Sequence, residues 1–141
     1  MNFQLDYNTM NTEIQKQFVS FEIAVKLKEL GFDEPCFASY RSNTSFLGKI
    51  DFENCTTEYL KRYEWLKPIL APTYSQAFRW FRQNHSLINC ISEQTINSFG
   101  FYIDKLGDNK ISQFREYTGL KTYEEAEEDC LKKLIEIVKQ K

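Results

Sequence analysis

The spacing of apolar residues changes twice between residues 74 and 138, and these changes limit the folds open to the chain. Residues 74–85 carry a helical stripe, made by Tyr74, Ala77, Phe78 and Phe81. Three stretches then alternate as strands do, at 87–93, 99–103 and 111–117, with a turn at Gly107-Asp108-Asn109. Helical spacing returns after residue 122. The order α-β-β-β-α predicts an antiparallel meander with a helix at each end.

The last helix has signals at its start and along its length. Thr122 and Glu125 form a T-x-x-E capping box. Acidic residues fill the first turns and lysines fill the later ones. This charge gradient is opposite in sign to the helix macrodipole and therefore stabilises the helix. The predicted buried stripe consists of Ala126, Cys130, Leu134, Ile137 and Val138.

The first half predicts a helix, a hairpin and a shorter helix. Ser20 caps a helix over 20–30, and Gly31 ends it so that Phe32 packs back onto Leu27. Residues 36–40 and 46–52 read as a hairpin around a turn at 42–44. Residues 56–67 fit a short helix that Pro68 ends.

These elements predict an α+β fold. We expect an antiparallel sheet, made of the hairpin and the three-stranded meander, with two to three helices packed on one face. We expect residues 1–17 to be a polar N-terminal extension and residues 18–141 to be one domain, because 141 residues suffice for one core.

The composition predicts a cytoplasmic protein that forms a homo-oligomer. The net charge of -2 gives no global attraction to nucleic acid or to an anionic membrane. No apolar run is long enough to span a bilayer, and the polar start lacks a secretory signal, so we expect a cytoplasmic protein without a membrane partner. The 12 Phe, 8 Tyr and 2 Trp suit a Phe-rich core, and any excess favours a homo-oligomer.

Catalytic and metal chemistry find little support in the residues. Cys36, Cys55, Cys90 and Cys130 are widely separated, so we interpret them as thiols, mostly buried, rather than zinc ligands. His85 has no neighbouring nucleophile, and the five glycines form no phosphate loop. We expect no cofactor, no metal and no enzymatic activity.

A basic and aromatic group is the best candidate for a binding site. Residues 56–85 hold five Lys or Arg against two Glu, in an otherwise acidic chain. Arginine beside an aromatic ring suits a phosphate, a base or a protein partner. The candidate residues are Arg79, Trp80 and Arg82 on helix 74–85, with Arg62 and Lys67 upstream. The alternative is an ordinary solvated face with Trp80 packed against a neighbouring loop.

Three stretches resemble uncharacterised small proteins common in phages and prophages of gut Bacteroidales. They are Gly31-Phe32-Asp33-Glu34-Pro35-Cys36-Phe37, Ala71-Pro72 with residues 76–82, and residues 123–127 running into 130–138. The resemblance implies a mobile-element origin and no particular activity. The α-β-β-β-α order also resembles a double-stranded RNA-binding domain, but positions 121–127 hold carboxylates where that family carries lysines.

The leading hypothesis is therefore a non-enzymatic phage or prophage accessory protein that acts by binding. Its partner would be a host protein, or a small nucleotide-like signal that it sequesters in counter-defence. A nucleic-acid-binding module is the first alternative, although the acidic chain argues against nucleic acid as the partner. An enzyme on an unfamiliar scaffold is the second.

Overall fold

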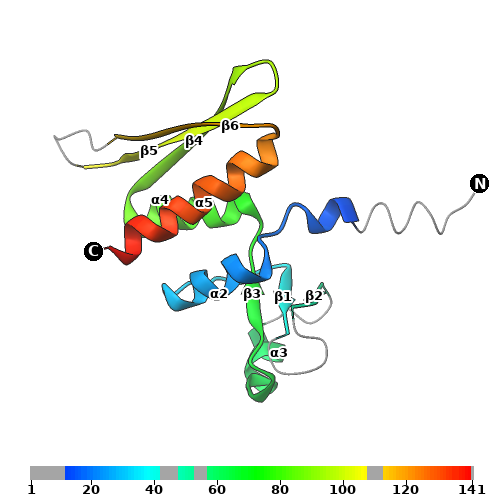
Figure 1. The fold of residues 1–141 in the computed structure, drawn as a ribbon. Helices are drawn as coiled ribbons and strands as arrows, with labels where there is room; N and C mark the ends of the chain where they lie inside the picture. The colour runs from blue at the N-terminus through cyan, green and yellow to red at the C-terminus, as the bar shows by residue number, and fades with distance from the viewer. Residues whose placement is uncertain (1–11, 42–47, 53–56, 108–112, 141) are drawn as a thin grey trace, which may run out of the picture. The chain divides into compact units, whose positions relative to one another are not determined.

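The computed structural model describes residues 12–41, 48–52, 57–107 and 113–140 (Figure 1). The contacts between residues divide the chain into two compact units, Met1–Thr73 and Tyr74–Lys141. The boundary falls between Thr73 and Tyr74, where the predicted helix 74–85 begins. The prediction of one domain over 18–141 stays a prediction.

Three short antiparallel strands form the described sheet of the first unit. They are β1 (Ala38–Tyr40), β2 (Ile50–Asp51) and β3 (Ile69–Ala71), in the order β2-β1-β3. β1 and β2 are the core of the predicted hairpin, and its predicted turn at 42–44 lies outside the described residues. β3 joins the other side of β1, with Tyr40 opposite Ile69. The predicted hairpin therefore gains a third strand and forms a sheet of its own.

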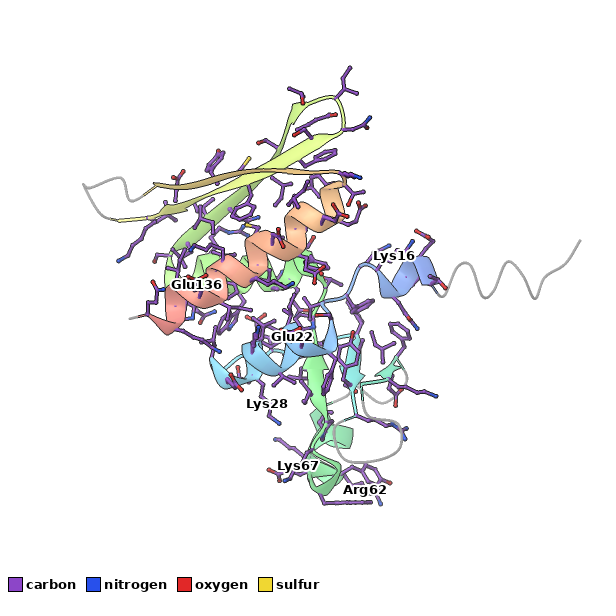
Figure 2. The ribbon with its side chains drawn as sticks, in the orientation of Figure 1. Lys16, Glu22, Lys28, Arg62, Lys67 and Glu136 are labelled. Atoms are coloured by element: carbon purple, nitrogen blue, oxygen red, sulfur yellow. The ribbon has the colours of Figure 1, made fainter. Side chains whose placement is uncertain are left out.

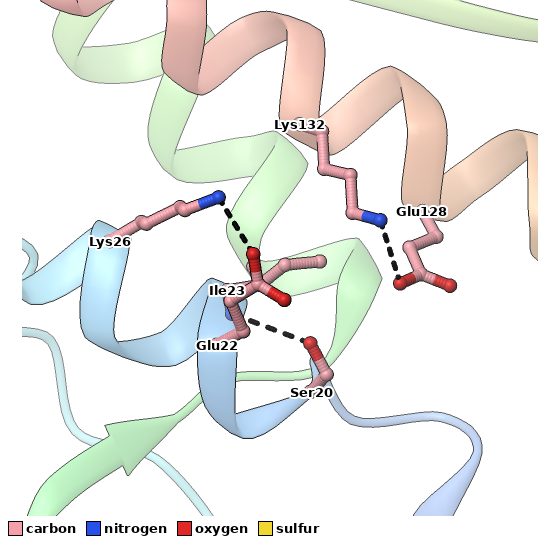
Figure 3. A network of polar contacts seen from close by, with 6 residues as sticks. All are labelled: Ser20, Glu22, Ile23, Lys26, Glu128 and Lys132. Carbon is pink, nitrogen blue, oxygen red and sulfur yellow. Dashed lines mark hydrogen bonds and ion pairs between the residues drawn. The ribbon is translucent and has the colours of Figure 1, made fainter.

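Helix α2 (Phe21–Glu29) begins and ends as its sequence predicts. The Ser20 hydroxyl accepts a hydrogen bond from the Ile23 N–H at 3.3 Å (Figure 3). At the other end Gly31 adopts φ 95°, and the Phe32 N–H donates to the Leu27 carbonyl at 3.0 Å. This is the Schellman arrangement, which needs a residue that tolerates positive φ. Ile23, Ala24 and Leu27 are buried, and α2 packs against β3.

The entry to α2 is tied to the end of β3. The Val19 N–H donates to the Pro72 carbonyl at 3.0 Å, and Phe18 and Thr73 form an isolated antiparallel bridge. Tyr40 strengthens this closure because its buried hydroxyl donates to the Val19 carbonyl at 2.7 Å. The burial raises the pKa of Tyr40, which keeps this hydroxyl protonated. These contacts thus join the two ends of the segment 18–73 to each other.

The stretch predicted as a helix over 56–67 is two shorter helices. α3 (Thr57–Arg62) is followed by the 3₁₀ helix η1 (Glu64–Leu66). Tyr63 between them leaves the helical region, at φ -113° and ψ 34°. Lys67 ends η1 in the left-handed conformation, at φ 47° and ψ 54°. The next residue, Pro68, disfavours the right-handed helical conformation at position 67, so the helix cannot continue.

The second unit has the predicted α-β-β-β-α order. It runs α4 (Tyr74–His85), β4 (Leu87–Thr95), β5 (Ser98–Lys105), β6 (Gln113–Leu120) and α5 (Tyr123–Lys139). The described strands form an antiparallel sheet in the order β4-β5-β6. Figure 1 shows α4 and α5 on the same side of this sheet. The α+β class, with antiparallel strands covered by helices, is confirmed.

The core of the second unit lies between the helices and the sheet. Phe101 and Ile103 of β5 are 2% and 1% exposed, and they project to the helix side with Phe99, whose ring lies 6.2 Å from that of Tyr123. The helices contribute buried residues that include Ala77, Phe81, Ala126, Cys130 and Leu134. β5 therefore presents its apolar side chains on the helix-covered face of the sheet, as the alternation of side chains along a strand allows.

Helix α5 is capped as predicted. The Thr122 hydroxyl accepts from the Glu125 N–H, and the Glu125 carboxylate accepts from the Lys121 N–H, both at 3.1 Å. Farther along, Lys132 pairs with Glu128 at 3.2 Å (Figure 3). No described helix is long and apolar enough to cross a membrane.

Candidate functional site

Two of the predicted site residues, Arg62 and Lys67, lie on the α3–η1 segment of the first unit. Both side chains are exposed, and so is that of Lys61. Figure 2 shows Arg62 and Lys67 on either side of this segment. Their charges therefore flank the segment and do not converge on one point, as they would around a single phosphate.

Trp65 lies between these two cations in the chain, and it is 69% exposed. Trp65 is not among the residues predicted from the sequence to form a site. A signal was present, because the apolar face predicted for 56–67 consists of Tyr59, Leu60, Tyr63 and Leu66 and leaves Trp65 outside it. An indole this exposed is unusual, since tryptophan is on average highly buried. We call the surface formed by Lys61, Arg62, Trp65 and Lys67 the basic tip.

The charge of the basic tip is mixed. Glu58 and Glu64 are exposed on the same segment, so residues 57–67 carry three cations and two carboxylates. Such a surface has a weak net field and a large apolar centre. Exposed tryptophan with arginine nearby is typical of the centre of a protein–protein interface.

Arg79 and Arg82 lie on α4 in the second unit. Both are exposed, and their spacing of three residues puts them on one face of the helix. In the described part of the chain neither forms an ion pair or a hydrogen bond through its side chain, and α4 contains no acidic residue. These arginines form a small cationic surface without an exposed aromatic ring among the residues of α4.

Trp80 is not part of that surface. The sequence pattern makes Trp80 a candidate binding residue, but its side chain is only 5% exposed. Its ring packs edge-on against Phe81 at 5.0 Å and against His85 at 4.8 Å. The buried face of α4 is thus wider than the predicted stripe and includes Trp80.

The predicted site residues therefore divide between the two units. Arg62 and Lys67 belong to the first unit, together with Trp65, and Arg79 and Arg82 belong to the second. The exposed tryptophan accompanies the upstream cations and not the arginines of α4.

A small cavity lies in the first unit, beside the end of α2. It holds about 170 Å³ and is lined by Lys28, Phe32, Asp33, Pro68 and Leu70. Sites for drug-sized ligands usually enclose roughly 300–1,000 Å³. The cavity combines one cation and one carboxylate with three apolar side chains, so it suits neither a nucleotide nor a phosphate group.

The described cysteines are buried or partly buried thiols, and they are not grouped with acidic residues as metal ligands are. Cys36 and Cys130 are buried thiols and Cys90 is partly buried, as predicted for most of the cysteines, while Cys55 lies outside the described residues. Burial raises the pKa of Cys130 far above its usual range, so this thiol stays protonated. Among the described residues, no three His, Cys, Asp or Glu side chains are grouped as metal ligands are.

No protein-family model matches the chain, and neither a curated protein nor a solved structure matches it.

Proposed function

We propose that this chain is a non-enzymatic binding protein whose basic tip contacts another protein. The observation that carries the proposal is Trp65, 69% exposed on a segment that also presents Lys61, Arg62 and Lys67. Burying an exposed indole against a partner removes a large apolar area from water, and a neighbouring arginine adds charged hydrogen bonds.

The mixed charge of the tip favours a protein over a nucleotide signal. A phosphate group needs converging cations, whereas Arg62 and Lys67 lie on either side of the segment (Figure 2). The exposed carboxylates of Glu58 and Glu64 would also repel a polyanion. A protein surface that carries both signs of charge around an apolar depression suits this arrangement better.

The biological setting that we propose is a phage or prophage of gut Bacteroidales. The resemblance of residues 31–37, of 71–72 with 76–82, and of 123–127 with 130–138 to small proteins of such elements supports it. The partner would then be a protein of the bacterial host, and counter-defence would be one outcome of binding it.

Site-specific photo-crosslinking tests this proposal. A photoreactive phenylalanine analogue replaces Trp65 in the full chain, and a matched variant carries it at Tyr123, which is 46% exposed in the other unit. We expect one host protein to be crosslinked from position 65 and not from position 123, and we identify it by mass spectrometry.

The affinity of the purified pair then decides the site. Trp65→Ala should weaken binding at least about 30-fold, which corresponds to the roughly 2 kcal/mol of an interface hot spot. The control Arg79→Ala/Arg82→Ala should bind as the wild type does. A folded Trp65→Ala variant with unchanged affinity would contradict the proposal.

Nucleic-acid binding through the second unit is the alternative. The α4–β4–β5–β6–α5 order and the exposed Arg79 and Arg82 favour it. Against it, the start of α5 presents exposed Glu124 and Glu125. A steep loss of RNA affinity with rising salt, removed by Arg79→Ala/Arg82→Ala, would replace the first proposal with this one.

A further inference from the structure

β4 is an edge strand without the usual protection of an edge. It stands at one end of the strand order β4-β5-β6 in the part of the chain that the structure describes. Seven residues, Leu87 to Glu93, pair with β5 without a shift of register, and the irregularity comes only after Glu93. Natural edges are usually interrupted by lysine, proline or a bulge. The sequence Leu-Ile-Asn-Cys-Ile-Ser-Glu has neither residue and carries one charge, at its end.

The other edge of the same sheet is less suited to pairing. β6 shifts its register against β5 between Phe99 and Phe101, and Gly119 of β6 has a φ of 60°. Within the described residues, the pairing of β6 before that shift covers Gln113 to Glu116. A long regular edge is therefore offered by β4.

We infer that β4 pairs antiparallel with β4 of a second copy of this chain. A two-fold axis through the middle of the seven-residue run passes beside Cys90, so Cys90 of one copy lies opposite Cys90 of the other. The same register puts Glu93 opposite Leu87 at each end, so that no two like charges face each other. A strand that complements itself in this way favours an identical partner.

The face arrangement agrees with this pairing. Cys90 lies opposite Tyr102, so both project away from the helix-covered side that Phe101 and Ile103 occupy. Both side chains are only partly buried. A two-fold axis perpendicular to the sheet keeps the helices of both copies on one side and joins the two sheets into a continuous one. The inference is independent of the basic tip, which lies in the other unit.

The central cysteine provides a direct test in the full-length chain. Directly opposite residues of antiparallel strands have Cα atoms about 4.5–5.5 Å apart, which is within the range for a disulfide. In a Cys55→Ser background, diamide should take two electrons from the two Cys90 thiols and yield a disulfide-linked dimer. Peptide mass spectrometry should find Cys90 joined to Cys90, because Cys36 and Cys130 are buried.

Native mass spectrometry and sedimentation of a matched series complete the test. Without oxidant, the wild type should have twice the 16.8 kDa mass of one chain. Cys90→Ser should remain dimeric without crosslinking. Cys90→Lys places two like charges opposite each other and should weaken the dimer at least tenfold, whereas Thr95→Lys, beyond the irregularity, should leave it intact. A monomeric wild type, or a dimer that crosslinks elsewhere and survives Cys90→Lys, would overturn the inference.

Discussion

The charged form of Glu127 on α5 is destabilised in the folded protein. Partial burial raises the pKa of its carboxyl, and the nearby Glu124 raises it further. As the pH rises, the unfolded chain loses this proton before the folded chain does. The contribution of the group to stability is therefore full below the ordinary pKa of glutamate and declines as the pH rises through the raised one.

Glu127→Gln should consequently stabilise the protein at pH 7 and have no effect at pH 3. The gain should be no more than about 0.5 kcal/mol, because solvent screens a half-buried charge. Chemical denaturation at the two pH values measures it. As a control, Glu136→Gln should bring no gain, since Glu136 pairs with Lys133 at 3.3 Å. An equal effect of Glu127→Gln at both pH values would exclude charge burial as its cause.

The two tryptophans mark how far the sequence predicts individual residues. Trp80 lies off the predicted stripe of α4, yet it is 5% exposed and its ring packs against Phe81 and His85. Trp65 lies off the predicted stripe of its segment and is exposed. Periodicity places both residues beside an apolar stripe, but only tertiary packing determines whether neighbouring rings cover that flank.

At the scale of elements, the helix ends were the most predictable features. Ser20, Gly31 with Phe32, and Thr122 with Glu125 all make the predicted backbone contacts. These signals are local, since a cap satisfies N–H and C=O groups within one turn of itself. The position of α4, residues 74–85, was predicted to the residue.

Removal of the α5 cap provides a quantitative test at this scale. Thr122→Ala leaves the Glu125 N–H without its side-chain acceptor and should lower the free energy of unfolding by about 1 kcal/mol. Thr122→Ser keeps the hydroxyl and should cost much less. Thermal or denaturant unfolding measures both variants. If alanine and serine cost the same, the hydrogen bond does not account for the effect.

The strand β3 and the break between α3 and η1 were not predicted. β3 has three residues, Ile69 to Ala71, between two prolines, and so short a run carries no recognisable period. Its strand character comes from pairing with β1, which is distant in sequence. Pairing between distant segments also determines which strands share a sheet, so the sequence did not predict that β1–β3 and β4–β6 form two separate sheets.

At the scale of the whole molecule, the division at residue 73 can be tested directly. The second unit has its own capped helix, sheet and buried residues, including Phe81, Ile103 and Leu134. We therefore expect a fragment of residues 74–141 to fold alone and to unfold cooperatively on heating, as measured by circular dichroism. An unfolded fragment beside a folded full chain would instead support the single domain that the sequence predicts.

The closure of the first unit between Val19 and Pro72 has a mechanical consequence. A force that pulls residues 18 and 73 apart acts first on the Val19–Pro72 hydrogen bond and on the Phe18–Thr73 bridge. While these contacts hold, the 54 residues between Phe18 and Thr73 lie outside the path of tension. Once they open, that length of chain becomes available for extension, so this one junction sets the force at which the first unit begins to unravel.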